Sequence, residues 1–303
     1  MGGTREDILM ALRVSGSSES AAWVMPVPSA AEVSLGDAGV FAELGRLTAP
    51  RIETRDSWWP TFDWLTASDP SGGETAGARP GAGVDVLGHQ PIGPFDVTRL
   101  AARDAAALAG WLTDNGFDHP NGLESNLAAY VADRWEIVAV KLIPATHGES
   151  LTGDLQPLRL SFVSDEVVYP MRLSRSATTP QTVDLYVMAD HRMDPTSVPV
   201  ANNAPTLEFA GRIERADVSQ ALADFVGEGT FLTRWNDAIA VPTAIGGDYI
   251  FHAANADTAY QQVIYRERNR GDLTGLALLA LIGLTVMIVV VALARGKRSR
   301  STP

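Results

Sequence analysis

The chain has 303 residues, of which 46% are hydrophobic and 20% are charged, values that are typical of a globular protein. Its formal net charge of −12 argues against nucleic acid as a partner, because an acidic surface repels phosphate backbones. It contains no cysteine, which excludes disulfides, thiolate metal sites, iron–sulfur clusters and cysteine nucleophiles.

Two strands are predicted near the start of the chain, at residues 8–14 and 21–27. In the stretch AAWVMPVPS, Pro26 and Pro28 lie two residues apart, so their missing N–H groups fall along the same side. Natural sheets use proline in this way to blunt an edge that could recruit another chain. We therefore expect residues 21–27 to form an edge strand.

Helices are predicted where a capping residue precedes apolar side chains at helical spacing. Asp37, Asp104 and Ser125 are each expected to cap a helix, and the helix after Asp104 is expected to close at Asn115. An amphipathic helix is also predicted at residues 217–226.

The remaining pattern is mostly strand. Residues 135–143 form a nearly continuous apolar run, which favours a central strand buried on both faces. Residues 158–162 alternate as a half-exposed strand does, and residues 84–100 resemble a hairpin. Further strands are expected in EVVYPMRL, VDLYVMAD and TLEFAGRIE. The predicted class is α+β, with mostly antiparallel sheets and inserted helices, plus one C-terminal transmembrane helix.

An aromatic cluster follows the first block of elements and consists of Trp58, Trp59, Phe62 and Trp64. Such a cluster can be buried as an anchor or exposed as a platform for glycan, lipid or protein, and the sequence leaves both open. We carry these four residues as candidate binding residues. The Gly- and Pro-rich stretch after them predicts a flexible insert.

The membrane segment is the strongest signal in the sequence. Leu273–Ala294 contains no charged side chain, and its 22 residues would span roughly 33 Å as a helix, close to the ~30 Å hydrocarbon core. A helix also satisfies its own backbone groups, as lipid cannot. We predict a single-pass transmembrane helix with the lipid bilayer as partner.

The flanking charges predict the orientation. Four basic residues follow the segment, in RGKRSRSTP, against three arginines in RERNRGD before it. This favours a cytoplasmic tail and an acidic domain outside the cell membrane. The first 14 residues show no export signal, so either the true start lies upstream or the domain is cytoplasmic on a C-terminal anchor.

The predicted organisation has five parts. An N-terminal β/α part (1–65) and a main α+β part (84–271) form the soluble domain, separated by the flexible insert (66–83). The transmembrane helix (272–294) and a basic cytoplasmic tail (295–303) complete the chain.

Several stretches occur in order over most of residues 7–195: AWVMPVPS, GDAGVFAELGRLTAPR, VLGHQPIGPFDVTRLAARDAAALAGWLTDNGF, WEIVAVKL, LQPLRLSFVSDEVVYPMRL and LYVMADHRM. Together they resemble an uncharacterised bacterial family, mainly actinobacterial, known as domain-of-unknown-function family 2330. The resemblance implies a secreted or membrane-anchored protein. It implies no activity and supplies no catalytic or binding residues.

Few residues suggest chemistry. His147 and Glu149, in HGE, and Asp190 and His191, in ADHRMD, are weak candidates for acid–base or metal chemistry, since neither motif has the spacing of a metalloprotease helix. Solvated loop side chains are the plainer interpretation of both. No GxSxG elbow and no phosphate-binding glycine loop occurs. We predict no metal and no cofactor.

Two functions from different classes remain open. The first is a membrane-anchored binding or interaction module outside the cell, with an unknown protein or small molecule as ligand. The second is a membrane-anchored hydrolase that uses carboxylate and histidine side chains. A deep pocket with converging carboxylates would favour the enzyme, and a flat apolar patch around Trp58 would favour the binding module.

Overall fold

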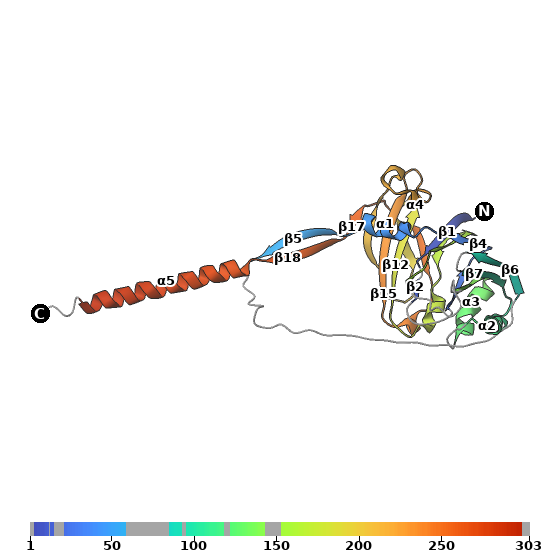
Figure 1. The fold of residues 1–303 in the computed structure, drawn as a ribbon, viewed down its shortest axis with the longest axis horizontal. Coiled ribbons are helices and arrows are strands. Elements are labelled where there is room, and N and C mark those ends of the chain that lie inside the picture. Colours follow the sequence, from blue (N-terminus) through green and yellow to red (C-terminus); the bar gives the residue numbers. More distant parts are fainter. Residues whose placement is uncertain are drawn as a thin grey trace. The chain divides into compact units, whose positions relative to one another are not determined.

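A computed structural model describes residues 3–11, 13–14, 21–58, 85–92, 95–117, 122–142 and 153–298. Contacts divide the chain into two compact units (Figure 1). The first unit comprises residues 1–49 and 75–262, and the second comprises residues 50–74 and 263–303. The predicted division of the chain into five parts, with the bounds given above, stays a prediction.

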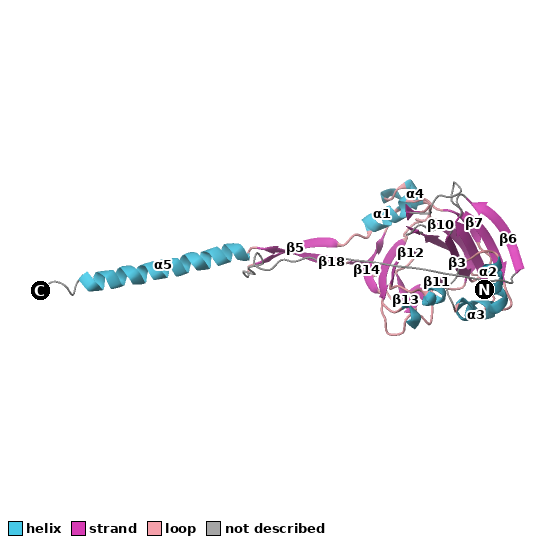
Figure 2. Ribbon diagram, turned by 60° about the horizontal axis from the view of Figure 1, so that its bottom comes forward, coloured by secondary structure: helices cyan, strands magenta, loops and turns pink. Residues whose placement is uncertain are grey.

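The first unit contains a four-stranded antiparallel sheet with two helices against one face (Figure 2). The strand order is β3 (Ala21–Val27), β8 (Glu136–Leu142), β7 (Phe95–Ala101) and β6 (Asp85–Ile92). Helices α2 (Ala105–Asp114) and α3 (Leu123–Ala132) bury their apolar sides on this sheet. Leu108, Leu112 and Leu127 meet Ile137 and Leu100 of the strands there.

The other face of this sheet packs on a second sheet of three strands. Its order is β1 (Thr4–Met10), β10 (Leu158–Ser164) and β4 (Glu32–Leu35), and all its pairs are antiparallel. Because side chains alternate along a strand, Leu158, Leu160 and Phe162 point together into the core between the sheets. The short strands β2 (Arg13–Val14) and β9 (Gly153–Asp154) pair with each other beside it.

The second half of this unit contains the strands of residues 167–261. It has the same arrangement as the first half: helices cover one face of a larger sheet, and the other face packs on a smaller sheet. The larger sheet has the order β12 (Gln181–Ala189), β15 (Phe231–Ile239), β14 (Thr206–Arg212) and β17 (Tyr260–Gln261). The smaller has the order β11 (Val167–Tyr169), β16 (Tyr249–Ala253) and β13 (Met193–Ser197). Trp235, Tyr249 and Phe251 lie in the core between them.

Helices α1 (Gly39–Leu47) and α4 (Gln220–Ala223) cover the other face of the larger sheet. Val40 and Leu44 of α1 and Leu222 of α4 are buried in this cluster together with Leu232 of β15. Among the described residues, short 3₁₀ helices occur between the larger elements, namely η2 (Arg172–Ser176), η3 (Arg215–Asp217) and η4 (Pro242–Ala244).

The second unit contains a two-stranded ribbon and a long helix. Strand β5 (Arg51–Ser57) pairs in parallel with β18 (Val263–Asn269), from Arg51 opposite Val263 to Ser57 opposite Asn269. The β5–β18 pair differs from the other strand pairs of the described residues, which are all antiparallel. Helix α5 (Gly271–Arg298) begins two residues after β18 ends.

The predicted α+β class with mostly antiparallel sheets is confirmed. Strand β3 lies at an edge of its sheet and pairs with β8, as the prolines predicted, and β8 lies between β3 and β7. Asp104 caps α2 as expected, because its Oδ1 accepts a hydrogen bond from the Ala107 N–H at 2.7 Å. The centre of the predicted hairpin at residues 84–100, Gly93-Pro94, lies outside the described residues.

Two helix predictions were wrong in their details. Ser125 does not cap α3, which begins at Leu123 after Gly122 in a left-handed conformation (φ 91°); the Ser125 hydroxyl donates to the Gly122 carbonyl from within the first turn. The predicted helix at 217–226 is reduced to the four residues of α4. The Leu222 and Phe225 side chains nevertheless pack where the amphipathic pattern placed them.

The apolar stretch predicted to be helical lies in α5. Among the described residues, none of the helices combines the length and the hydropathy of a membrane span. Membrane crossing therefore stays a prediction.

Candidate functional site

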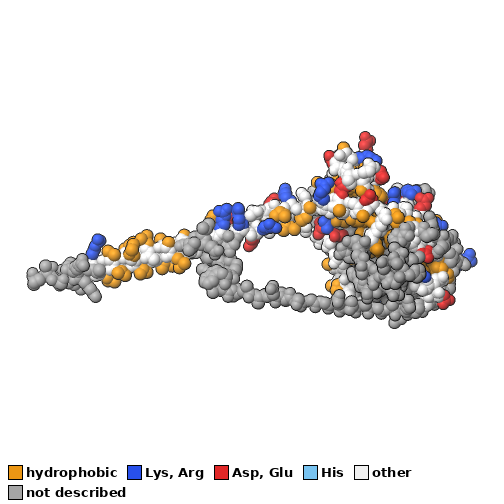
Figure 3. Space-filling view, viewed as in Figure 1, with side chains coloured by type: hydrophobic (Ala, Val, Ile, Leu, Met, Phe, Trp, Pro, Cys, Tyr) orange, Lys and Arg blue, Asp and Glu red, His pale blue; other side chains and the backbone are white. Residues whose placement is uncertain are grey.

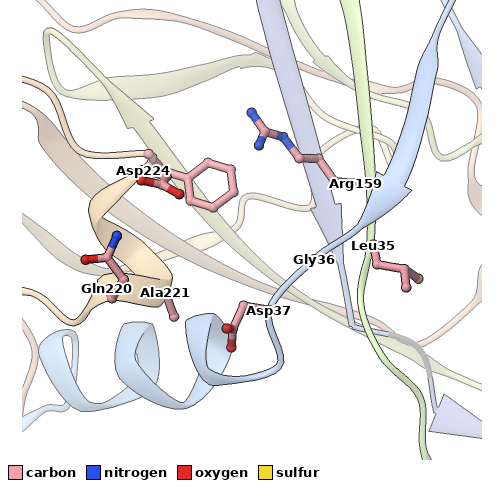
Figure 4. A pocket seen from close by; sticks show the side chains of 8 residues that line it. Leu35, Gly36, Asp37, Arg159, Gln220, Ala221 and Asp224 are labelled. Carbon is pink, nitrogen blue, oxygen red and sulfur yellow. The ribbon is translucent and has the colours of Figure 1, made fainter. Parts of the chain in front are cut away.

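The first unit has a hollow of about 320 Å³ where α4 faces the loop between β4 and α1 (Figure 4). The loop contributes Gly36 and Asp37, and α4 contributes Gln220. Asp224 and Arg159 complete its polar lining. We call this hollow the α1–α4 cleft; Leu35, Ala221 and Phe225 also line it.

Arg159, the arginine of the cleft, is paired with the carboxylate of Asp7. Its Nε and Nη2 atoms donate to the two carboxylate oxygens of Asp7 at 3.2 and 3.0 Å, and its guanidinium lies 4.8 Å from the centre of the Phe225 ring. Burial alone would raise the pKa of Asp7, but the hydrogen bonds from Arg159 and Ser161 lower it. Arg159 is thus a fixed wall of the cleft, and Asp37 and Asp224 add two carboxylates to its lining. Asp37 Oδ1 accepts the Gly39 N–H at 2.7 Å, and Asp224 Oδ1 lies 3.5 Å from Arg215 Nη2 at the exposed surface.

Gly36 lies so close to Leu9 and Pro157 that a side chain has little room there. The Gly36 N–H donates to the Pro157 carbonyl at 2.7 Å, and a Cβ at Gly36 would lie 2.3 Å from Leu9 Cδ1 and 3.2 Å from Pro157 Cβ. Any larger residue must therefore displace Leu9 from its place beside α1.

We expect Gly36→Ala to destabilise the protein by about 1 kcal/mol, the low end of the usual cost of overpacking, because the clashing atom is the end of a flexible side chain. Gly45→Ala is the matched control, because Gly45 lies within α1 and its added Cβ would meet nothing within 4 Å. Alanine in a helix interior is favoured over glycine by about 0.5–1 kcal/mol, so this change should stabilise. Chemical unfolding of both variants measures the two effects, and the same sign for both would contradict this account of Gly36.

Of the two predicted ADHRMD candidates, His191 contacts a carboxylate and Asp190 does not enter this contact. His191 Nδ1 lies 3.2 Å from Asp257 Oδ2, and the same oxygen accepts from Arg212 Nη2 at 2.7 Å. The backbone N–H of Arg192 donates to the other oxygen, and this bond, with His191 and Arg212, lowers the pKa of Asp257. Asp190 is exposed in the turn after β12. The arrangement ties the β12–β13 turn to the segment before β17.

Of the remaining predicted site residues, the structure describes only Trp58. His147, Glu149, Trp59, Phe62 and Trp64 lie outside the described residues. Trp58 belongs to the second unit and is 53% exposed, with the Arg270 guanidinium 5.3 Å from its ring centre. Within the described parts of the chain, no three His, Asp or Glu side chains are arranged to hold a metal ion.

A hydroxyl, an imidazole and a carboxylate that the sequence analysis missed lie in a row on the smaller sheet of the second half. Thr196 Oγ1 is 2.7 Å from His252 Nδ1, and His252 Nε2 is 3.6 Å from Glu166 Oε1. They come from β13, from β16 and from the turn before β11, so no local motif could have indicated them. About half of the His252 and Glu166 side-chain surface is exposed, and the Thr196 hydroxyl also donates to the Ile250 carbonyl at 3.3 Å. Water at such an open surface weakens the electrostatic stabilisation that nucleophilic catalysis needs.

Comparison with known families identifies the group to which the chain is related. Residues 1–252 match DUF2330, described as an uncharacterized protein conserved in bacteria. The chain belongs to DUF2330. No curated protein and no solved structure matches it.

The DUF2330 match has a structural boundary. It includes every residue that lines the α1–α4 cleft and the Thr196–His252–Glu166 row. It ends at His252, so β17, β18 and α5 lie beyond it. The family match therefore covers most of the first unit and strand β5 of the second, and β18 and α5 lie outside the matched residues.

Proposed function

We propose that this DUF2330 chain is a single-pass membrane protein whose first unit is a binding module outside the cell. The observation that carries the proposal is the surface of α5. Its large apolar side chains from Leu278 to Leu293 are 41–64% exposed, and Figure 3 shows hydrophobic side chains along the helix. An apolar surface of this extent is costly in water, and lipid would solvate it.

The sequence around the helix supports the same proposal. No charged residue occurs from Leu273 to Ala294, and the basic tail that follows suits the cytoplasmic side. The first unit carries most of the acidic charge of the chain, which suits a body kept away from an anionic membrane surface.

Membrane fractionation tests the anchor. We expect the full chain to stay with membranes after alkaline carbonate extraction, whereas a chain that ends at Arg270 is released. A chain that ends at Arg298 keeps all of α5 and is the control, so it should stay with membranes. Release of the full chain by carbonate would contradict the anchor.

Orientation can be tested with thiol labels, because the chain has no cysteine of its own. Ala201→Cys lies on an exposed turn of the first unit, and Ser301→Cys lies in the basic tail. A membrane-impermeant maleimide should label the first variant in intact cells and the second only after lysis. The reverse pattern would place the first unit in the cytoplasm.

A binding role for the first unit is supported by the α1–α4 cleft. Its arginine is paired with Asp7, and two further carboxylates, those of Asp37 and Asp224, line the hollow from two elements (Figure 4). Asp224 Oδ1 also lies 3.5 Å from Arg215 Nη2, but both side chains of this pair are exposed, so water screens it and a bound cation can compete with it. Such a lining fits the ammonium or guanidinium group of a small ligand or peptide. The open Thr196–His252–Glu166 row and His191, whose Nδ1 contacts Asp257, support a hydrolase less well.

A panel of primary amines and lysine- or arginine-containing dipeptides can test this binding role by calorimetry on the full chain. For a probe that binds, Asp224→Asn should weaken affinity about fivefold, the equivalent of about 1 kcal/mol for one charge pair in water. Asp217→Asn removes an equal charge from the exposed end of η3, outside the cleft lining, and should change little. Equal effects of the two substitutions would mean that net charge, and not the cleft, determines binding.

A further inference from the structure

Two segments that are more than 200 residues apart in sequence meet at the first turn of α5. The Arg270 N–H donates to the Ser57 carbonyl at 2.7 Å, and the Thr274 hydroxyl donates to the Trp58 carbonyl at 2.5 Å. These bonds continue the parallel pairing of β5 and β18 onto the helix. The backbone of Trp58 is therefore fixed beside the point where the apolar stretch begins at Leu273.

The side chains at this junction form a compact charged and aromatic group. Asp56 Oδ1 accepts from Arg268 Nε at 2.7 Å, and Asp56 Oδ2 lies 3.1 Å from Arg270 Nε. The hydrogen bond from Arg268 is the main reason that the pKa of Asp56 is lowered. One carboxylate between two guanidinium groups leaves one positive charge in excess. We call Asp56, Trp58, Arg268 and Arg270 the Trp58 cluster.

The exposed parts of this cluster have the chemistry of a membrane interface. Tryptophan is enriched where the hydrocarbon meets the headgroups, because its ring is apolar while its N–H needs a polar partner. Arginine donates to phosphate oxygens in a fixed fork, and it can keep its stem in apolar surroundings while its head reaches water. Trp58 is 53% exposed, and 58% of the Arg268 side chain is exposed.

We propose that the Trp58 cluster lies in the headgroup layer of the bilayer, with the Trp58 ring among lipid headgroups and the two arginines on lipid phosphates. This inference rests on the proposed membrane anchor. It assigns an interfacial role to the one described residue of the predicted aromatic cluster. The occupant of the exposed Trp58 surface is lipid, and not a glycan or a protein.

The weakness of the ribbon is a second, independent argument for support from the bilayer. Parallel strands occur almost only in sheets covered on both faces, and two strands alone are marginally stable in water. Yet β5 and β18 expose Ile52, Ile264 and Tyr265, at 58%, 48% and 60%. A headgroup contact at Trp58 would hold β5 and α5 to the same surface and so keep the end of the ribbon paired.

Depth-dependent quenching tests the proposal with the full chain in vesicles of phosphatidylcholine and phosphatidylglycerol. Because the chain lacks cysteine, Ser57→Cys gives a unique labelling site that leaves Trp58 in place. Leu284→Cys, within α5, and Ala201→Cys, on an exposed turn, serve as reference positions. Each variant carries an environment-sensitive fluorophore and meets lipids with a nitroxide either near the headgroup or near the acyl-chain end.

We expect the label at position 57 to be quenched by the shallow nitroxide, the label at 284 by the deep one, and the label at 201 by neither. Adding Trp58→Ala to Ser57→Cys should abolish the shallow quenching, while position 284 stays deep. If the label at 57 is unquenched while that at 284 is deep, the anchor holds and the interfacial cluster is refuted. If position 284 is unquenched, the anchor itself fails. Shallow quenching that survives Trp58→Ala would refute the role of the ring.

Discussion

Replacing Asp248 with alanine should destabilise the protein by about 2–4 kcal/mol, because it leaves buried hydrogen-bond donors and a partly buried arginine without their acceptor. Asp248 is 6% exposed and lies just before β16. Its Oδ1 accepts from the Tyr130 hydroxyl at 2.5 Å and from the Met171 N–H at 2.7 Å, and its Oδ2 lies 3.0 Å from Arg172 Nε. Without the carboxylate, these three donors lose a common partner in the interior.

The position of Asp248 makes this loss large. Tyr130 belongs to α3 of the first half of the unit, whereas Asp248 and Met171 belong to its second half. The hydroxyl proton is held firmly, because burial and the Asp248 charge both raise the pKa of Tyr130. The carboxylate therefore joins the two hydrophobic cores, at a junction where Asn126 of α3 also donates to the Ser176 hydroxyl at 2.8 Å.

Thermal and chemical unfolding of the full chain in mild detergent measure the effect, with an expected drop in Tm of about 10 °C for a unit of this size. Tyr130→Phe removes one donor and keeps the ring, so it should cost only about 1 kcal/mol. Asp248→Asn keeps the shape and should fall between the two. If Asp248→Ala costs no more than Tyr130→Phe, the carboxylate does not organise this junction.

Local patterns predicted those elements whose neighbours agree with their own propensity. The apolar run at β8 required burial on both faces, and the structure puts β8 between β3 and β7. Pro26 required a side free of pairing, which an edge supplies. Asp104 needed only its own first turn to act as a cap. In each case the deciding interaction lies within a few residues or follows from burial alone.

The ribbon shows what such patterns cannot predict. Strand β5 has the sequence RIETRDS, whose charged side chains do not suggest a buried strand, and its partner β18 follows more than 200 residues later. Parallel pairing without a covering helix has no composition signal of its own. The register is held instead by specific contacts, such as Asp56 with Arg268, which only the folded chain brings together.

The candidate sites divide in the same way. ADHRMD marked a real cluster, but His191 and Asp194 are engaged with Asp257 and Arg192. The α1–α4 cleft and the Thr196–His252–Glu166 row combine residues from separate elements, and no spacing in the sequence relates them. Asp37 was predicted only as the cap of a helix, whereas the N-cap of α1 is Ala38; Asp37 lies one residue earlier, accepts the Gly39 N–H at 2.7 Å and lines the cleft.

Glu6 should make the protein less stable as the pH rises from about 5 to 9, in contrast to most carboxyl groups. Burial raises its pKa from 4.5 to about 8, although the Val168 N–H donates to its carboxylate at 3.2 Å and so opposes the shift. The folded state then holds a proton that the unfolded state releases near pH 4.5. The stabilisation is complete below that pH and is lost as the pH passes the folded pKa near 8.

Glu6→Gln should remove this dependence, because the amide has the same shape, carries no charge and can still accept the Val168 N–H. At pH 9 we expect it to be more stable than the parent by roughly 3 kcal/mol, less than the full shift would give because the side chain keeps some access to water. Below about pH 4, where the unfolded chain also keeps the proton, the two should be equal. Unfolding of the full chain in mild detergent across this range measures the difference.

Glu32→Gln is the matched control, since Glu32 lies on β4 of the same sheet with 78% of its side chain exposed. Its substitution should cost at most about 1 kcal/mol through the lost pair with Arg5 and leave the slope with pH unchanged. Parallel pH profiles for the parent and Glu6→Gln would mean that Glu6 ionises in the folded state without penalty. The slope of stability against pH therefore tests whether burial raises the pKa of Glu6, and stability at any single pH does not.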